Sequence, residues 1–256
     1  MLIAVTRAVS PTLAECELTH LPRDPIDVAK AIADHAGYEA ALRSLGASVV
    51  RAPEEPTLPD AVFVEDTALV FDETAVMTRP GAATRRREVE SMAAVLRTYR
   101  PLLEIKPPGT LDGGDVMIVG RRVYAGLSSR TNREGIAQLD THLSEWGYEV
   151  IPVPVTGCLH LKSAVTQVAD SLLLINDRWV SPECFGSMRT VTVAPGEPDA
   201  ANALLIGASV IYPTHHPATA ERLDRAGVRL VPVPCGELAK AEGGVTCCSV
   251  VFEVKA

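Results

Sequence analysis

Aromatic residues are scarce in this chain of 256 residues, where they make up 4%. Proteins that bind single-stranded nucleic acids stack the bases on aromatic side chains, so this composition argues against such a surface. The formal net charge of −8 argues against any phosphate-backbone partner. An acidic chain suits a cationic small molecule, although many ordinary cytosolic enzymes are equally acidic. We therefore expect no nucleic acid among the partners.

Long hydrophobic runs are also lacking. The opening MLIAVT is too brief for the apolar part of a signal peptide, and no basic segment precedes it. No stretch reaches the apolar length that spans a bilayer. The sequence thus predicts a cytoplasmic protein with no membrane partner.

Metal-ligand cysteine spacing is the third absence. The chain has six cysteines and no C-x-x-C pair, so zinc-ribbon spacing is missing. Disulfides are rare in reducing compartments. Cys247 and Cys248 are adjacent in a predicted C-terminal strand, CCSVVFEV, where neighbouring side chains point to opposite faces. We expect them neither to bridge each other nor to share a metal, which leaves a nucleophile or core packing.

What the chain does contain is a loose repeat. The stretches that begin at Asp66, Asp115 and Asn202 each read as strand, turn, strand, link and helix. A divergent copy begins at Ser163, and a fifth could combine the C-terminal strand with the N-terminal one. Such self-similarity predicts repeated units with a shared core, in one domain over residues 1–256. Predicted helices cover residues 27–45, 84–99, 131–146 and 219–226, and three of them end at a glycine. An ordinary open α/β sheet is the alternative.

Polar residues gather in three places beside predicted strands. In LPDAVFVEDTALVF, Asp60, Glu65 and Asp66 repel one another unless a cation lies among them; a solvated loop is the alternative. In GTLDGGDV, a Gly-Gly pair that permits close approach separates Asp112 from Asp115, of which Asp115 is the better candidate for a structural role. In TGCLHLKS, His160 stands between two leucines. A single strand histidine is usually a partly buried residue with satisfied hydrogen bonds, unless the fold brings Cys247 to it.

A cysteine, a histidine and several acids are typical of covalent hydrolysis of a cation. The cysteine must be accessible and must become a thiolate, and a partner must transfer protons. A guanidinium stays charged at physiological pH, and its N–H fork matches carboxylates. Carboxylates can fix it beside the thiol while the histidine protonates the departing amine.

Six motifs occur in an order that resembles a known family: FVEDTALV, TRPGAATRR, LDGGDV, GLSSRTN, LHLKS and TCCSV. From about Arg7 to Val254 the chain resembles the dimethylarginine dimethylaminohydrolases, which belong to the guanidino-modifying superfamily. The resemblance implies a five-bladed α/β propeller of ββαβ modules around a central channel. It implies hydrolysis of Nω-methylated arginines to citrulline and a methylamine, without metal or organic cofactor.

The motifs also imply roles for individual residues. Cys247 resembles the nucleophile and His160 the general acid and later base. Asp112 resembles a carboxylate that orients His160 or the guanidinium, which Asp66 holds. The remaining implied substrate contacts are Asp60 and Glu65 in the cationic pocket, Arg85 and Arg130 on the α-carboxylate, and the backbones of Leu18 and Ala241.

Three other functions remain open at this stage. An arginine deiminase uses the same residues on unmethylated arginine. A non-catalytic binding protein could share the propeller but would not need the cysteine, the histidine and the acids together. A metal-dependent amidine hydrolase lacks paired ligand spacing such as H-x-x-x-D or D-x-H. The expected partner is a small-molecule cationic amino acid substrate, and the chain could form a homodimer.

Overall fold

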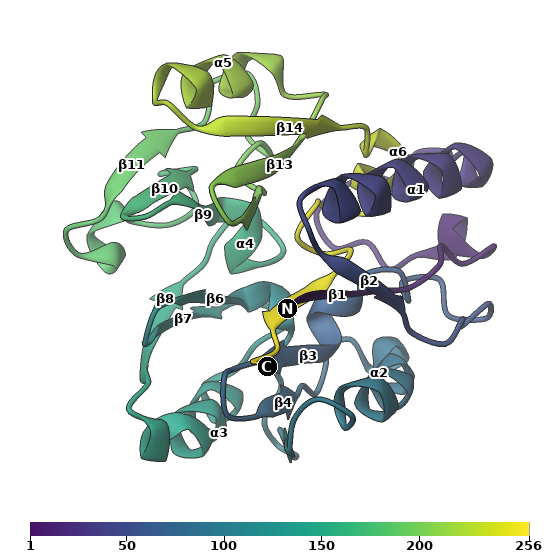
Figure 1. Cartoon of the computed structure of the whole chain (residues 1–256), viewed down its shortest axis with the longest axis vertical. Coiled ribbons are helices and arrows are strands. Elements are labelled where there is room, and N and C mark those ends of the chain that lie inside the picture. Colours follow the sequence, from purple (N-terminus) through teal and green to yellow (C-terminus); the bar gives the residue numbers. More distant parts are fainter. Residues whose placement is uncertain (256) are drawn as a thin grey trace.

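The repeated stretches fold as five three-stranded sheets in the computed structural model, which describes residues 1–255. In every sheet the first two strands pair antiparallel, and a connection returns the third strand parallel to the second. This is the predicted ββαβ unit. Figure 1 shows the five sheets arranged around a centre, with the longer helices at the periphery.

Four modules follow one another along the chain. The first contains β3 (Ala68–Val70), β4 (Ala75–Met77), α2 (Glu88–Leu96) and β5 (Leu102–Glu104). The second contains β6 (Val116–Val119), β7 (Arg122–Leu127), α3 (Arg133–Leu143) and β8 (Glu149–Pro154). The third contains β9 (Val165–Ala169), β10 (Leu172–Ile175) and β11 (Arg189–Thr192), and only a short 3₁₀ turn, Pro182–Phe185, replaces its helix. The fourth contains β12 (Leu204–Ile206), β13 (Ser209–Pro213), α5 (Pro217–Arg225) and β14 (Arg229–Val233).

The two ends of the chain build the fifth module together, as the sequence predicts. Strand β15 (Val250–Glu253) pairs antiparallel with β1 (Leu2–Thr6), and α1 (Val28–Ser44) leads to β2 (Ser48–Arg51). The N-terminal amino group donates to the carbonyl oxygen of Val254 at 2.7 Å, so the termini lie side by side (Figure 1). This pairing closes the ring and leaves no gap between its first and last modules.

The predicted helices are present, with ends set by local chemistry. Asp27 caps α1 by accepting a hydrogen bond from the backbone N–H of Lys30, and Gly46 follows with a φ of +90°. The predicted helix 84–99 divides into a 3₁₀ segment, Ala83–Arg87, and α2. The helix predicted at 131–146 likewise divides into α3 and a 3₁₀ turn, Ser144–Trp146.

The core fills the spaces between neighbouring modules and their helices. Leu139 and Leu143 of α3, for example, are fully buried in one cluster with Phe71 and Leu111. Burial of one such leucine contributes roughly 2 kcal/mol to stability. Among residues 1–255, none of the helices combines the length and the apolar character needed to cross a bilayer.

The first strands of the five modules surround a central cavity of about 280 Å³. Its wall includes residues of β3, β6, β9, β12 and β15, so it follows the axis of the ring. Glu65, Lys162 and Thr246 lie at the border between this channel and the candidate site. The ring therefore brings loops from several modules together over one end of the channel.

Candidate active site

Cys247 lies in a turn, not in the strand that the sequence predicted. Strand β15 begins only at Val250, and the backbone N–H of Cys247 donates to the carbonyl oxygen of Gly244 at 3.2 Å. In the same turn, the backbone N–H of Gly244 donates a hydrogen bond to Sγ of Cys247 at 3.2 Å. The strand prediction for Cys247 and Cys248 was wrong because local turn bonds replace ladder pairing here. Both thiols are buried and unpaired, so the prediction that they do not bridge is confirmed.

The two glycines Gly243 and Gly244 permit close packing around Cys247. A Cβ on Gly243 would overlap the ring of Phe63, and one on Gly244 would overlap the side chain of Asn202. Asn202 in turn accepts the backbone N–H of Thr246 at 3.0 Å and donates to its hydroxyl at 2.9 Å. The Gly-Gly pair thus fixes the turn that carries the thiol.

His160 also lies outside a strand, contrary to prediction. It precedes the one-turn helix α4 (Leu161–Ala164), whose first backbone N–H donates to a carboxylate oxygen of Asp115 at 2.9 Å. Asp115 also accepts the hydroxyl of Ser128 at 2.6 Å. The expected structural role of Asp115 therefore fits its contacts: it anchors the segment that presents His160.

A buried charge network surrounds the imidazole. Nε2 of His160 lies 3.0 Å from Oδ2 of Asp112, and Nδ1 lies 3.8 Å from Oδ1 of Asp66. Burial alone would lower the pKa of His160, but Asp66, Asp112 and Asp115 outweigh it and raise this pKa to about 9. Burial would raise the pKa of Asp66, yet His160 and Arg85 lower it to about 2. Near neutral pH the site thus holds an imidazolium between carboxylates.

The Gly-Gly pair of LDGGDV is required by this network. A Cβ on Gly114 would lie 2.6 Å from Nδ1 of His160 and 2.7 Å from a carboxylate oxygen of Asp66. The backbone N–H of Gly114 donates to that same oxygen at 2.9 Å. A Cβ on Gly113 would overlap the carbonyl oxygen of Glu65. Glycine here lets two loops approach until the carboxylates reach the histidine.

Arg85 is committed mainly to protein partners. Its guanidinium donates to Asp66 at 2.5 Å and to both carboxylate oxygens of Glu88, at 3.1 and 2.8 Å. It also donates to the carbonyl oxygens of Asp60 and Phe63. The side chain lines the cavity, but these contacts chiefly hold Asp66 in place. Its implied contact with a substrate carboxylate stays a prediction.

Unlike Arg85, Arg130 has a guanidinium nitrogen that no described protein group accepts. Nη1 is buried and lacks a hydrogen-bond partner among the described residues, while an oxygen of Asp112 lies 3.9 Å away. Nη2 donates to the hydroxyl of Thr19 at 2.9 Å. Asp60 lies in the same cavity and accepts the backbone N–H of Glu17 at 3.1 Å. A cationic donor without a hydrogen-bond partner and an acid therefore line the same cavity.

Glu65 points toward the central channel. Its carboxylate accepts Nζ of Lys162 at 2.6 Å and the hydroxyl of Thr246 at 2.8 Å. It is not among the residues that line the catalytic cavity, and its implied contact with a substrate stays a prediction. Sequence reasoning gave no role to Lys162 or Thr246, although both lie in quoted motifs. A lysine in the apolar stretch LHLKS was the available signal, because a buried charge needs a partner.

Of the two predicted backbone contacts, Ala241 lines the cavity and Leu18 does not. Ala241 is buried. Leu18 is half-buried and packs against the hydrophobic cluster that contains Cys247, while its neighbour Glu17 lines the cavity instead. The roles of Leu18 and Ala241 stay predictions.

One small cavity joins these groups. Cys247, His160, Asp66, Asp60, Arg85, Arg130 and Ala241 all line it. Its free volume is about 10 Å³, which is room for roughly one water molecule. Burial, followed by the charges of Glu65 and Asp66, raises the pKa of the Cys247 thiol well above its ordinary range. The thiol is therefore protonated near neutral pH until another positive charge arrives.

Asp66, Asp112 and His160 also bring one ligand atom each within 4.8 Å of one another. Every carboxylate oxygen of this trio already has a partner. Asp66 accepts from Gly114 and Arg85, while Asp112 accepts the backbone N–H of Gly81 and pairs with His160. These contacts fit an ion-pair network around an imidazolium.

The fold and the cavity place the chain in a class of enzymes, the hydrolases that act on guanidino C–N bonds. A family model described as N,N dimethylarginine dimethylhydrolase, eukaryotic, matches residues 22–183. The chain is 39% identical to N(G),N(G)-dimethylarginine dimethylaminohydrolase of Streptomyces coelicolor, with 96% of this chain and 95% of the relative covered. It is 35% identical to the enzyme of the same name from Pseudomonas aeruginosa, with coverage of 88% and 90%. The chain belongs to the dimethylarginine dimethylaminohydrolase family.

Solved structures agree with this assignment. A cysteine-to-serine variant of the Pseudomonas aeruginosa enzyme, complexed with citrulline, superposes with a TM-score of 0.91 at 34% identity and covers 97% of this chain and 98% of its own. A histidine-to-glycine variant of a dimethylarginine dimethylaminohydrolase, an adduct with S-methyl-L-thiocitrulline, matches equally well, with a TM-score of 0.91, 34% identity and coverage of 98% and 100%. The N-terminal domain of the cyanobacterial arginine dihydrolase ArgZ shares the fold, with a TM-score of 0.87, at 16% identity and coverage of 99% and 98%. The predicted five-module propeller is confirmed.

Proposed function

We propose that this chain hydrolyses Nω-methylated arginines to citrulline and a methylamine, with Cys247 as the nucleophile. The observation that carries the proposal is one closed cavity lined by Cys247, His160 and Asp66 together with Asp60 and Arg130. Such a cavity offers a thiol and an acid to a guanidinium, and opposite charges to the amino-acid end. Family membership supports the same reaction.

The charges of the cavity suit the two ends of an arginine derivative. The carboxylate of Asp66 binds the guanidinium beside the thiol, because its low pKa keeps it ionised. The unpartnered Nη1 of Arg130 takes the α-carboxylate, and Asp60 attracts the α-amino group. Backbone carbonyl groups of Leu18 and Ala241 complete this end.

The first half of the reaction forms a covalent intermediate. A guanidinium beside Cys247 favours the thiolate, and the thiol proton leaves to solvent. The thiolate attacks the guanidino carbon to give a tetrahedral adduct. Protonated His160 gives its proton to the departing amine nitrogen, the C–N bond breaks, and a thiouronium remains on Cys247.

The second half restores the free enzyme. Neutral His160 takes a proton from water as the water oxygen attacks the thiouronium carbon. The hydroxyl proton of this second adduct passes to the sulfur as the C–S bond breaks, so citrulline leaves and both the Cys247 thiol and the imidazolium between Asp66 and Asp112 are restored. The hydrogen bond that Nε2 of His160 donates to Asp112 keeps the ring oriented throughout.

The arginine deiminase alternative uses the same steps with ammonia as the leaving group. Identities of 35–39% to dimethylarginine dimethylaminohydrolases favour the methylated substrates.

All six cysteines are unpaired, which supports a reducing, cytoplasmic location.

The test is citrulline formation from Nω,Nω-dimethylarginine, Nω-monomethylarginine and arginine in parallel, with a chelator present. We expect turnover of both methylated substrates, little of arginine, and none by Cys247→Ala. Turnover of arginine alone would move the chain to the deiminases. Normal turnover by Cys247→Ala would refute the covalent mechanism.

A further inference from the structure

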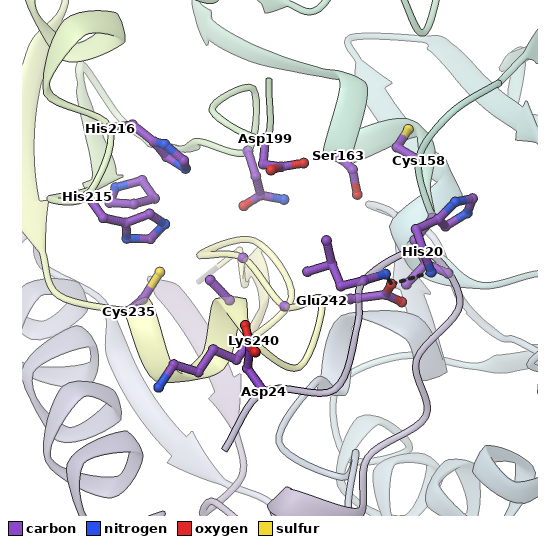
Figure 2. Close-up of a pocket in the computed structure, with 18 of the residues that line it drawn as sticks. His20, Asp24, Cys158, Ser163, Asp199, His215, His216, Cys235, Lys240 and Glu242 are labelled. Carbon is purple, nitrogen blue, oxygen red and sulfur yellow. Dashed lines mark hydrogen bonds between the residues drawn. The ribbon is translucent and has the colours of Figure 1, made fainter. Parts of the chain in front are cut away.

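One carboxylate that lines the catalytic cavity, that of Glu242, holds a short segment of the loop between β1 and α1. Oε1 of Glu242 accepts the backbone N–H groups of His20 and Leu21, at 2.5 and 2.6 Å, and Oε2 accepts that of Thr19 at 2.9 Å. Figure 2 shows Glu242 with the hydrogen bonds to this segment. We call residues 19–21 the lid tip. Three successive amides on one carboxylate are a strong, charge-assisted attachment.

Glu242 also stands between two cavities. It lines the catalytic cavity of about 10 Å³ and an outer cavity of about 410 Å³, and both cavities share Leu159 and Gly243. Figure 2 looks into the outer cavity, where His20 and Cys158 lie on one side and His215 on the other. A space that holds about one water cannot admit an amino acid. The wall shared by the two cavities must therefore move for any substrate to enter.

The backbone of Glu242 supports a specific use of its side chain. Its φ is +58°, in the left-handed region that favours glycine. The next two residues, Gly243 and Gly244, are glycines because a Cβ would overlap neighbouring side chains. Of residues 242–244, only position 242 has a backbone conformation that favours glycine, and yet it carries a glutamate. Such strain persists where the surrounding contacts hold it, commonly at binding sites.

The rest of the loop is fastened elsewhere. The backbone N–H of Glu17 donates to Asp60, and the guanidinium of Arg23 donates to the carbonyl oxygens of Ala14 and Cys16. The lid tip is held by the carboxylate of Glu242 and by a hydrogen bond that Arg130 donates to the hydroxyl of Thr19. The tip can thus separate from Glu242 while its base remains attached.

We propose that Glu242 is the latch of the lid: a positioning residue whose carboxylate holds residues 19–21 shut, and whose release joins the outer cavity to the catalytic cavity. The identity of the entering molecule rests on the proposed function, whereas the latch itself does not. The outer cavity suits the entry of a cation, because the carboxylates of Asp24, Asp199 and Glu242 outnumber the single ammonium of Lys240. Glu242 acts through the lid and not on the reacting atoms.

The first test measures hydrogen exchange of the amides of Thr19, His20 and Leu21 in Glu242→Gln. Loss of the charge leaves weaker hydrogen bonds, so we expect these amides to exchange about tenfold faster than in the unsubstituted protein. Glu197→Gln is the matched control, because Glu197 also accepts two successive backbone amides, at Ala218 and Thr219, away from the lid. Unchanged exchange at the lid tip in Glu242→Gln would overturn the proposal.

A second variant, Glu242→Gly, removes the carboxylate and suits the left-handed backbone. We expect it to speed exchange at the lid tip at least as much as Glu242→Gln. Protection of the three amides in a folded Glu242→Gly protein would overturn the latch. Because exchange is measured without substrate, absence of citrulline formation by the unsubstituted enzyme would refute the proposed function and leave this test intact.

The kinetic constants KM and the rate of citrulline dissociation distinguish a latch from a residue with a merely structural role. A weaker latch lets substrate and product escape sooner, so we expect Glu242→Gln to raise KM several-fold and to speed citrulline dissociation. The single-turnover rate at saturating substrate should stay within about twofold, since no reacting atom is touched. A several-fold fall in the single-turnover rate with an unchanged KM would overturn the positioning role.

Discussion

Replacement of Asp112 by asparagine tests whether the buried charge network sets the protonation of His160. Asp112 is fully buried, and its Oδ2 lies 3.0 Å from Nε2 of the imidazole. Burial lowers the pKa of His160, and it is the neighbouring carboxylates that raise it to about 9. Asp112→Asn removes one of these charges and leaves Asp66 in place. We expect the pKa of His160 to fall below 9.

The size of the effect follows from the shift. A rise from 6.5 to about 9 corresponds to roughly 3 kcal/mol, at 1.36 kcal/mol per pKa unit. Because the folded-state pKa is raised, this stabilisation is fully present below the unfolded value near 6.5. It is lost as the pH rises through about 9. Asp112→Asn should therefore reduce the loss of stability between pH 7 and pH 10.

The variant also has a hydrogen-bonding consequence. Asp112 accepts the backbone N–H of Gly81 at 2.8 Å with its other oxygen. An asparagine has one acceptor oxygen, so either Gly81 or protonated His160 must face its NH₂ group. An unsatisfied buried donor costs about 1–3 kcal/mol, so the variant is less stable at pH 7.

Two measurements separate these effects. Titration of the His160 ring by NMR gives its pKa directly in the free protein, and the basic limb of kcat/KM against pH reports the same proton. Both midpoints should move to lower pH in Asp112→Asn, together. If the basic limb of the variant coincides with that of the unsubstituted enzyme, the assignment of His160 as the acid is refuted.

Three further predictions use the same network. Gly114→Ala should fold but lose at least about 100-fold in kcat, because its Cβ would lie 2.6 Å from Nδ1 of His160; circular dichroism and citrulline formation check this, and near-normal kcat would contradict it. Arg85→Met should lower the free energy of unfolding by about 3–5 kcal/mol, because it leaves the buried carboxylate of Asp66 without its cation; urea unfolding measures it. Cys247 should react slowly with iodoacetamide at pH 7 and faster as the pH rises, since burial raises its pKa; mass spectrometry follows it, with the other five cysteines as internal controls.

The sequence predicted the ring because its repeat is carried by local signals. Alternating apolar residues, caps and C-terminal glycines mark the strands and helices of each module. The helix at 27–45 matches α1 within one residue at each end, because Asp27 and Gly46 both act as predicted. The third module departs from the pattern, since no helix-length segment separates β10 from β11 and only the 3₁₀ turn Pro182–Phe185 forms.

The local conformation of the site was predicted less well. Apolar neighbours made His160 and Cys247 resemble strand residues, yet both lie where strands do not form. Each is held by a contact from a distant part of the chain: the carboxylate of Asp115 binds the backbone after His160, and Asn202 binds the backbone before Cys247. The periodicity of a single sequence carries no information about such long-range hydrogen bonds. The residue types were found because motifs carry them, whereas their geometry depends on the closed ring.

The same limit explains the acids. Sequence proximity grouped Asp60, Glu65 and Asp66 as one cationic pocket, but the 3₁₀ segment Val64–Thr67 sends adjacent side chains in different directions. Glu65 meets Lys162 beside the central channel, whereas Asp66 faces the histidine. Asp66 is thus shared between Arg85 and His160, and in the proposed reaction also with the arriving guanidinium. It raises the pKa of His160, which protonates the leaving group in the proposed reaction, and with Glu65 it raises the pKa of the Cys247 thiol. In the proposed reaction, a nucleophile that stays neutral until its substrate arrives is therefore a direct consequence of excess carboxylates around a buried cysteine.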